Sequence, residues 1–165
     1  MHIASLANFA SAIAVVVAVI FGTLQIRQMR KTRALFTLAE LVHAMQTPEF
    51  TQSVRRVMTL PDAADPERIA ADVEMAESVL ALSHVYESIG VLVYHRVIHL
   101  HLVDDLLGGY IRQSWKKIRP YVEFRRAEMG ISYGEWMQWL AERLDEYPSP
   151  GKHGGAHRTH RKWKP

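Results

Sequence analysis

Residues 3–26 read IASLANFASAIAVVVAVIFGTLQI, and no Asp, Glu, Lys or Arg interrupts these 24 residues. As an α-helix the stretch is about 36 Å long at about 1.5 Å per residue, enough to cross a hydrocarbon core of about 30 Å. The sequence therefore predicts a transmembrane anchor over residues 1–26. The alternatives are a cleaved signal peptide and a buried core helix. The stretch lacks a basic start and a suitable cleavage site, and it is longer than a core helix needs to be.

Four basic residues directly after the apolar run predict the orientation of the anchor. Positive residues stay on the cytoplasmic side of a membrane. We therefore expect an inner (cytoplasmic) membrane protein with its N-terminus outside and its soluble domain in the cytoplasm. The cations, which we expect to contact the headgroups of the lipid membrane, are Arg27, Arg30, Lys31 and Arg33.

Small residues recur every four positions along the anchor, at Ala10, Ala14, Ala18 and Gly22. This spacing lets two helix backbones approach closely in lipid, where packing drives association. The sequence thus predicts a homo-oligomer that forms through this transmembrane packing face. The alternative is that alanine is simply common in membrane helices.

Charge divides the remainder of the chain into regions. Residues 34–146 hold 11 cations and all 17 acids, a net charge of −6, whereas residues 147–165 hold five cations and no acid. We expect a juxtamembrane helix over 27–46, a helical bundle domain over 47–146 and a disordered basic tail over 147–165. The acidic body argues against nucleic acid as a partner. We expect the basic stretch from Arg112 to Arg126 to face lipid headgroups instead.

Helical spacing recurs throughout the body, and no stretch alternates with the period of two that a strand requires. We predict that the first helix runs unbroken to about Gln46. Thr47 and Asp65 precede prolines as helix caps. Asp104 and Asp105 open a later helix, Pro120 kinks or breaks it, Gly130 ends the next stretch, and Ser132 caps the last. The predicted soluble helices span about residues 48–60, 66–94, 104–119, 121–129 and 133–146.

The fold class predicted is all-α, with one N-terminal transmembrane helix that continues into a small antiparallel helical bundle. One apolar stripe steps 4, 3, 4, 3, 4 along the longest soluble helix, at Met75, Val79, Leu82, Tyr86, Ile89 and Val93. The segment 79–94 is short for a second span and contains His84 and Glu87, so we expect it to be a core helix.

Glu87 is a candidate buried acid, because it is the sole acidic residue between Val79 and Tyr94. A buried carboxylate is costly unless it is paired or protonated. One interpretation is a proton- or ligand-binding acid. The others are a solvated helix face shared with His84, or an ion pair with Arg112 or Arg119.

No catalytic residue, cofactor site or metal site is predicted. His95, His99 and His101 lie near Asp104 and Asp105, and these residue types suit zinc. Their spacing matches no zinc signature, and the acids are explained as first-turn residues of a helix. The tail histidines can hold a metal only loosely. We expect the tryptophans of the body to be core anchors at Trp115, Trp136 and Trp139.

Several segments together carry a resemblance to a known family. They are the anchor with LQIRQ at 24–28, YESIGVLV at 86–93, LLGG at 106–109 and SWKKIRPY at 114–121. Over about residues 3–144 the chain resembles a bacterial family of small single-pass membrane proteins catalogued as domain of unknown function 4760. The resemblance implies an all-helical, membrane-anchored protein and adds no activity. It marks residues 87–90 and Trp115 as the first positions to test.

The leading functional hypothesis is a non-enzymatic, membrane-anchored scaffold that presents its helical domain to a cytoplasmic protein partner. The alternative is an oligomeric pore or transport-accessory protein, although the anchor offers no ionisable lining. An enzymatic interpretation rests on Glu87 and the central His/Asp cluster alone.

Overall fold

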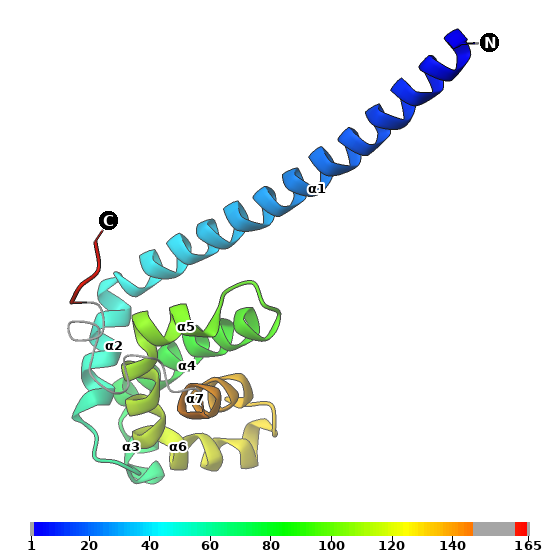
Figure 1. Ribbon diagram of the computed structural model, residues 1–165. Helices are drawn as coiled ribbons and strands as arrows, with labels where there is room; N and C mark the ends of the chain where they lie inside the picture. Colours follow the sequence, from blue (N-terminus) through cyan, green and yellow to red (C-terminus); the bar gives the residue numbers. More distant parts are fainter. Residues whose placement is uncertain (1, 147–160, 165) are drawn as a thin grey trace. The chain divides into compact units, whose positions relative to one another are not determined.

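The computed structural model describes residues 2–146 and 161–164, with side chains from residue 15 onward except at positions 30, 31, 33–35, 37 and 38. The chain divides into two compact units, Met1–Glu40 and Leu41–Pro165. Every regular element in the described residues is helical, and they contain no strand (Figure 1). The predicted all-α class is therefore confirmed.

Helix α1 (His2–Met45) makes up the first unit and ends just inside the second. No proline or glycine follows Gly22 within it, and its end at Met45 confirms the predicted unbroken helix. Large apolar side chains between Val15 and Met29 are exposed, from 47% at Val17 to 70% at Phe21. This stretch therefore buries none of its large apolar side chains.

The first two helices of the second unit begin at the predicted caps. At the start of α2 (Pro48–Thr59), Phe50 donates its backbone N–H to Thr47 Oγ1 at 3.3 Å. At the start of α3 (Pro66–Ala71), Glu67 donates its backbone N–H to Asp65 Oδ1 at 3.0 Å. Each helix has a proline at its first position, where a missing N–H costs nothing.

The predicted single helix from Pro66 to Tyr94 is wrong, because the segment forms two helices, α3 and α4 (Val73–Tyr94). Asp72 separates them with φ −98° and ψ 99°, and its Oδ1 accepts the N–H of Met75 at 3.0 Å. An aspartate in this extended conformation is a preferred helix start. The break is hidden in the sequence because no glycine or proline marks it.

The next helix begins earlier than predicted. Helix α5 (Leu100–Val103) passes through a π-helical turn, η1 (Asp104–Gly108), into α6 (Gly109–Met129). Asp104 and Asp105 therefore lie one turn inside the helix, and the prediction that they open it is wrong.

Pro120 was predicted to kink or break the helix, and of these two the break is wrong, because α6 passes through Pro120 without ending. A proline inside a helix leaves the carbonyl four residues earlier without its donor. Here Ala63 donates its backbone N–H to the carbonyl of Lys116 at 2.9 Å, and Ala64 donates to that of Lys117 at 2.9 Å. The loop between α2 and α3 thus supplies the donor that Pro120 lacks.

Gly130 ends α6 with φ +91°, as predicted, and the last helix, α7 (Glu135–Glu146), begins five residues later. Ser132 is therefore not its N-cap, which corrects the prediction; its carbonyl accepts the N–H of Glu135 at 3.3 Å. Gly134, with φ +69°, lets the chain pass close to Val122, because a Cβ there would lie 2.6 Å from Val122 Cγ1.

The core of the second unit lies between α4 and α6, each of which packs against α2, α3 and α7 (Figure 1). The predicted stripe on α4 is confirmed, with Val79, Leu82, Tyr86 and Ile89 fully buried and Met75 and Val93 partly buried. Other fully buried side chains are Ile69, Leu107, Ile111, Ile118, Met137, Leu140 and Leu144.

Candidate interaction sites

The transmembrane packing face is described over half of its length. Ala18 is exposed, and a Cβ built on Gly22 would meet nothing within 4 Å. The side chains of Ala10 and Ala14 lie outside the described residues. Of the four flanking cations, Arg27 is exposed. The other three, whose side chains also lie outside the described residues, are Arg30, Lys31 and Arg33.

Within the described part of the chain, the helix that is long and apolar enough to cross a membrane is α4, by length and composition alone. Its most apolar window has a mean hydropathy of 1.2 and is 39% buried. Because α4 packs against α2, α3 and α7, the core accounts for its apolar side chains. The described apolar part of α1, Val15–Met29, is shorter than a span.

Glu87 makes a contact that the sequence did not suggest. Its Oε1 accepts the backbone N–H of Met137 at 2.7 Å, and it also accepts the backbone N–H of Trp136. Both donors belong to the first turn of α7, whose N–H groups have no partner inside the helix. Glu87 on α4 therefore caps α7 from a neighbouring helix, in place of an ion pair with Arg112 or Arg119.

The environment of Glu87 shifts its ionisation. Burial raises the pKa of the Glu87 carboxyl, while the hydrogen bonds from Met137 and Trp136 oppose the rise. Glu135 repels the charged form, and Arg126 attracts it more weakly. Helix N-termini favour a negative charge, so the carboxylate suits its structural role.

Gly90, one turn along α4 from Glu87, lets α7 approach closely. A Cβ at this position would lie 2.6 Å from the carbonyl oxygen of Trp136. The segment 87–90, which carries part of the family resemblance, therefore contacts the start of α7. Glu87 accepts backbone hydrogen bonds there, and Gly90 leaves room for the backbone of Trp136.

Aromatic rings gather beside this contact. The ring of Tyr94 lies 4.9 Å from that of Trp136 and 6.0 Å from that of Trp139, and the two indoles are 5.9 Å apart. Trp115 is buried, which confirms it as a core anchor, whereas Trp136 and Trp139 are half-buried and Tyr94 is 55% exposed. These three rings form a partly exposed aromatic cluster.

Arg112 ties the π-helical turn to the end of α7. Its guanidinium pairs with Asp104, donates to the carbonyl of Leu144 at 2.8 Å and lies 3.3 Å from the carboxylate of Asp145. A Cβ on Gly108 would overlap Asp104 Oδ1. The glycine of the LLGG segment therefore leaves room for this ion pair.

The central histidines form no cluster with the neighbouring acids. The His99 and His101 rings stack at 5.4 Å, and His95 packs edge-on against Tyr94. Among the described residues, no group of three or more His, Cys, Asp or Glu side chains could hold a metal ion.

The basic stretch of α6 pairs largely within its own domain. Lys116 lies 3.4 Å from Asp62, Arg119 donates to Glu123 at 2.7 Å, and Arg125 pairs with Glu128 at 2.8 Å. These pairs reduce the charge left for lipid headgroups.

Buried hydroxyls meet between α4 and α6. Tyr86 and Ser114 are fully buried, and burial raises the pKa of Tyr86 to about 12, which Ser114 partly opposes. No hydrogen bond of good geometry reaches Ser83 Oγ, Tyr86 Oη or Ser114 Oγ within the described residues. The phenol therefore stays protonated at neutral pH, and a buried hydroxyl without a well-formed hydrogen bond lowers the stability of the core.

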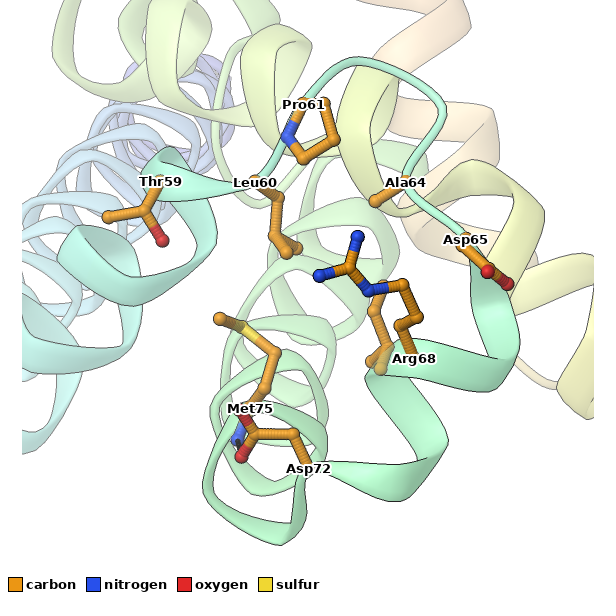
Figure 2. Close-up of a pocket in the computed structure, with 9 residues that line it drawn as sticks. Thr59, Leu60, Pro61, Ala64, Asp65, Arg68, Asp72 and Met75 are labelled. Carbon is orange, nitrogen blue, oxygen red and sulfur yellow. Dashed lines mark hydrogen bonds between the residues drawn. The ribbon is translucent and has the colours of Figure 1, made fainter.

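A pocket of about 290 Å³ opens where the α2–α3 loop meets α3 and the start of α4 (Figure 2). Figure 2 shows the guanidinium of Arg68 between the loop and Met75. The pocket is lined by apolar, acidic and basic side chains, among them Leu60, Pro61, Asp65, Arg68, Asp72 and Met75. The sequence did not reveal this site, because its walls come together only when the end of α2, the following loop, α3 and the start of α4 fold against one another.

The comparisons with known proteins give a family and no activity. No curated protein and no solved structure matches the chain. A family model described as a domain of unknown function, DUF4760, matches residues 9–144. These residues contain every segment that carried the resemblance except the start of the anchor. The chain therefore belongs to the DUF4760 family.

Proposed function

We propose that this protein is a non-enzymatic, membrane-anchored scaffold that self-associates through its N-terminal helix and presents its helical domain to a cytoplasmic protein partner. The observation that carries the proposal is the exposed apolar surface of α1. Successive residues Val15, Val16 and Val17 are exposed by 63%, 57% and 47%. At about 100° per residue, successive exposed positions face different sides of the helix.

A helix that is apolar on every side needs a non-aqueous environment, because soluble proteins rarely expose apolar patches larger than a few hundred Å². Lipid satisfies this requirement over the whole circumference of the helix. The cationic flank from Arg27 to Arg33 supports a cytoplasmic position for the second unit.

Fractionation tests the anchor. We expect the full-length protein to sediment with membranes after lysis without detergent, and its helical domain to resist protease added outside intact cells. A protein that partitions wholly into the aqueous fraction, or a domain digested from outside, contradicts the proposal.

Cross-linking and native mass spectrometry in mild detergent test self-association through the transmembrane packing face. We expect Ala18→Leu to shift the oligomer toward monomer, because a larger side chain keeps the backbones apart. Val16→Leu is the matched control, since position 16 lies on the opposite side of the helix. A monomeric protein that neither substitution affects contradicts this part of the proposal.

A further inference from the structure

The pocket beside Arg68 has the size and chemistry to take one aromatic side chain. Its volume of about 290 Å³ lies just below the range of about 300–1,000 Å³ for pockets that take drug-sized ligands. Leu60 and Met75 supply apolar surface, and a methionine sulfur makes favourable contacts with aromatic rings. Arg68 adds a planar cation that stacks well on an indole.

Arg68 is available for such a contact. Its side chain is exposed, and no ion pair or hydrogen bond joins it to another residue in the part of the chain that the structure describes. Figure 2 shows it reaching across the pocket toward Leu60. An occupant of the pocket would therefore meet a guanidinium without first breaking a pair.

The segment that forms the pocket is acidic. Residues 62–77 contain six acidic residues and one arginine, a net charge of −5. Glu74 pairs with Arg56, and Asp62 lies near Lys116 and Lys117. Asp65 and Asp72 line the pocket itself, and each uses Oδ1 to cap a helix. The occupant should therefore carry positive charges on both sides of its aromatic ring.

The chain contains a segment with this composition. Residues 147–165 hold five cations and no acid, and Trp163 stands between Lys162 and Lys164. This charge is opposite in sign to that of Asp65 and Asp72, the two acids that line the pocket. Trp163 is 71% exposed in the single chain, so it does not fill the pocket of its own copy.

We propose that the pocket of one copy of this chain binds the segment 161–164 of a second copy, with the indole of Trp163 against Arg68 and Met75. Lys162 and Lys164 then lie beside Asp65 and Asp72. The contact goes beyond the proposed function, because it links the soluble domains whether or not the anchors associate.

Cysteine cross-linking tests the contact directly, since the chain has no cysteine of its own. One full-length chain carries Thr59→Cys and is the acceptor; a second, with a different affinity tag, carries Lys164→Cys and is the donor. The two chains are mixed in detergent micelles and oxidised. Thr59 lines the pocket and is exposed. A chain with Ile131→Cys is the control acceptor, because Ile131 is 85% exposed and lies outside the pocket. We expect a cross-linked heterodimer with position 59 and about tenfold less with position 131.

Further variants identify the groups responsible. Trp163→Ala in the donor chain should lower the yield about tenfold, as expected for a tryptophan at the centre of a contact. Asp65→Asn and Asp72→Asn together should lower it severalfold, because asparagine keeps the cap and removes the charge. Circular dichroism checks that each variant keeps its helical content.

Equal yields at positions 59 and 131 overturn the proposal, and so does a yield that Trp163→Ala does not change. A third chain carries both Thr59→Cys and Lys164→Cys, and a cross-link that forms only within this single chain also overturns the proposal. The last result would mean that the tail binds its own copy. Repeating the assay with Ala18→Leu in both chains separates this contact from association of the anchors, because the cross-link should persist when anchor association is lost.

Discussion

The backbone N–H of Ala63 donates at 2.9 Å to the carbonyl oxygen of Lys116, the group that Pro120 leaves without a helical donor. Ala63 reaches this position with φ 51°, in the left-handed region that favours glycine. The same loop contributes Leu60 and Pro61 to the pocket. The proline inside α6 and the strained alanine in the α2–α3 loop therefore fix one wall of the proposed binding site.

Ala63→Gly should raise the free energy of unfolding by about 0.5 kcal/mol. The left-handed conformation costs an alanine roughly 1–2 kcal/mol, and glycine's greater backbone entropy costs roughly 0.5–1 kcal/mol. Ala64→Gly is the control, because Ala64 is buried and its φ is not positive, and it should lower the same quantity. Urea unfolding in detergent, followed by circular dichroism, measures both; a shift of the same sign in the two variants contradicts the argument.

Gly90→Ala should destabilise the contact between α4 and α7 by about 1–3 kcal/mol, because its Cβ would collide with backbone and not with a flexible side chain. Gly109→Ala is the matched control, since it is also helical and nothing lies within 4 Å of its Cβ. There we expect stabilisation of up to about 1 kcal/mol from helix propensity. Thermal unfolding of the two variants should show shifts of opposite sign, and a Gly90→Ala protein as stable as the parent is the contrary outcome.

Glu87 gives a third prediction, through its role as the cap of α7. Glu87→Ala removes the acceptor for Met137 and Trp136 and should cost about 1 kcal/mol. Glu87→Gln keeps an acceptor oxygen and should remain close to the parent at neutral pH. Urea midpoints compare the two variants. If the glutamine variant is as unstable as the alanine variant, the charge and not the hydrogen bond is what α7 requires.

The pH dependence of stability follows from the same residue. Burial raises the pKa of Glu87 above 4.5, so just above that pH the folded state holds a proton that the unfolded state has lost. The contribution of Glu87 to the free energy of unfolding therefore falls as pH rises through this window. Urea midpoints measured from about pH 4 upward should show this fall in the parent and not in Glu87→Gln. Parallel curves for the two proteins would contradict the assignment.

The sequence predicted most of the secondary structure because its signals are local. The caps at Thr47 and Asp65, the stripe on α4 and the end of α6 at Gly130 each depend on residues a few positions apart. The prediction of a break at Pro120 was wrong because a segment distant in the sequence determines whether the helix continues. Pro120 is tolerated because Ala63 supplies a donor from another loop, which no local pattern reveals.

The candidate site was predicted less well for the same reason. The sequence marks Glu87 as an acid whose burial is costly. Its partners are backbone N–H groups of α7, and because every residue except proline has such a group, the sequence does not identify them. The role of Gly108 depends on the side chain of Asp104 one turn away. The π-helical turn that brings them together has no sequence signature comparable to a cap or a stripe.

Arg112 gives the last prediction, because it pairs with a nearly buried acid. The side chains of Arg112 and Asp104 are 20% and 7% exposed, and the guanidinium also reaches the end of α7. Arg112→Met leaves Asp104 charged without this partner and should cost about 3 kcal/mol. Arg112→Lys should cost less, since an ammonium keeps the charge but cannot reach several acceptors at once. Arg119→Met is the control, because Arg119 forms an exposed ion pair, and such pairs stabilise a fold little. Equal losses for Arg112→Met and Arg119→Met in urea unfolding would show that the Arg112 network does not hold α7 in place.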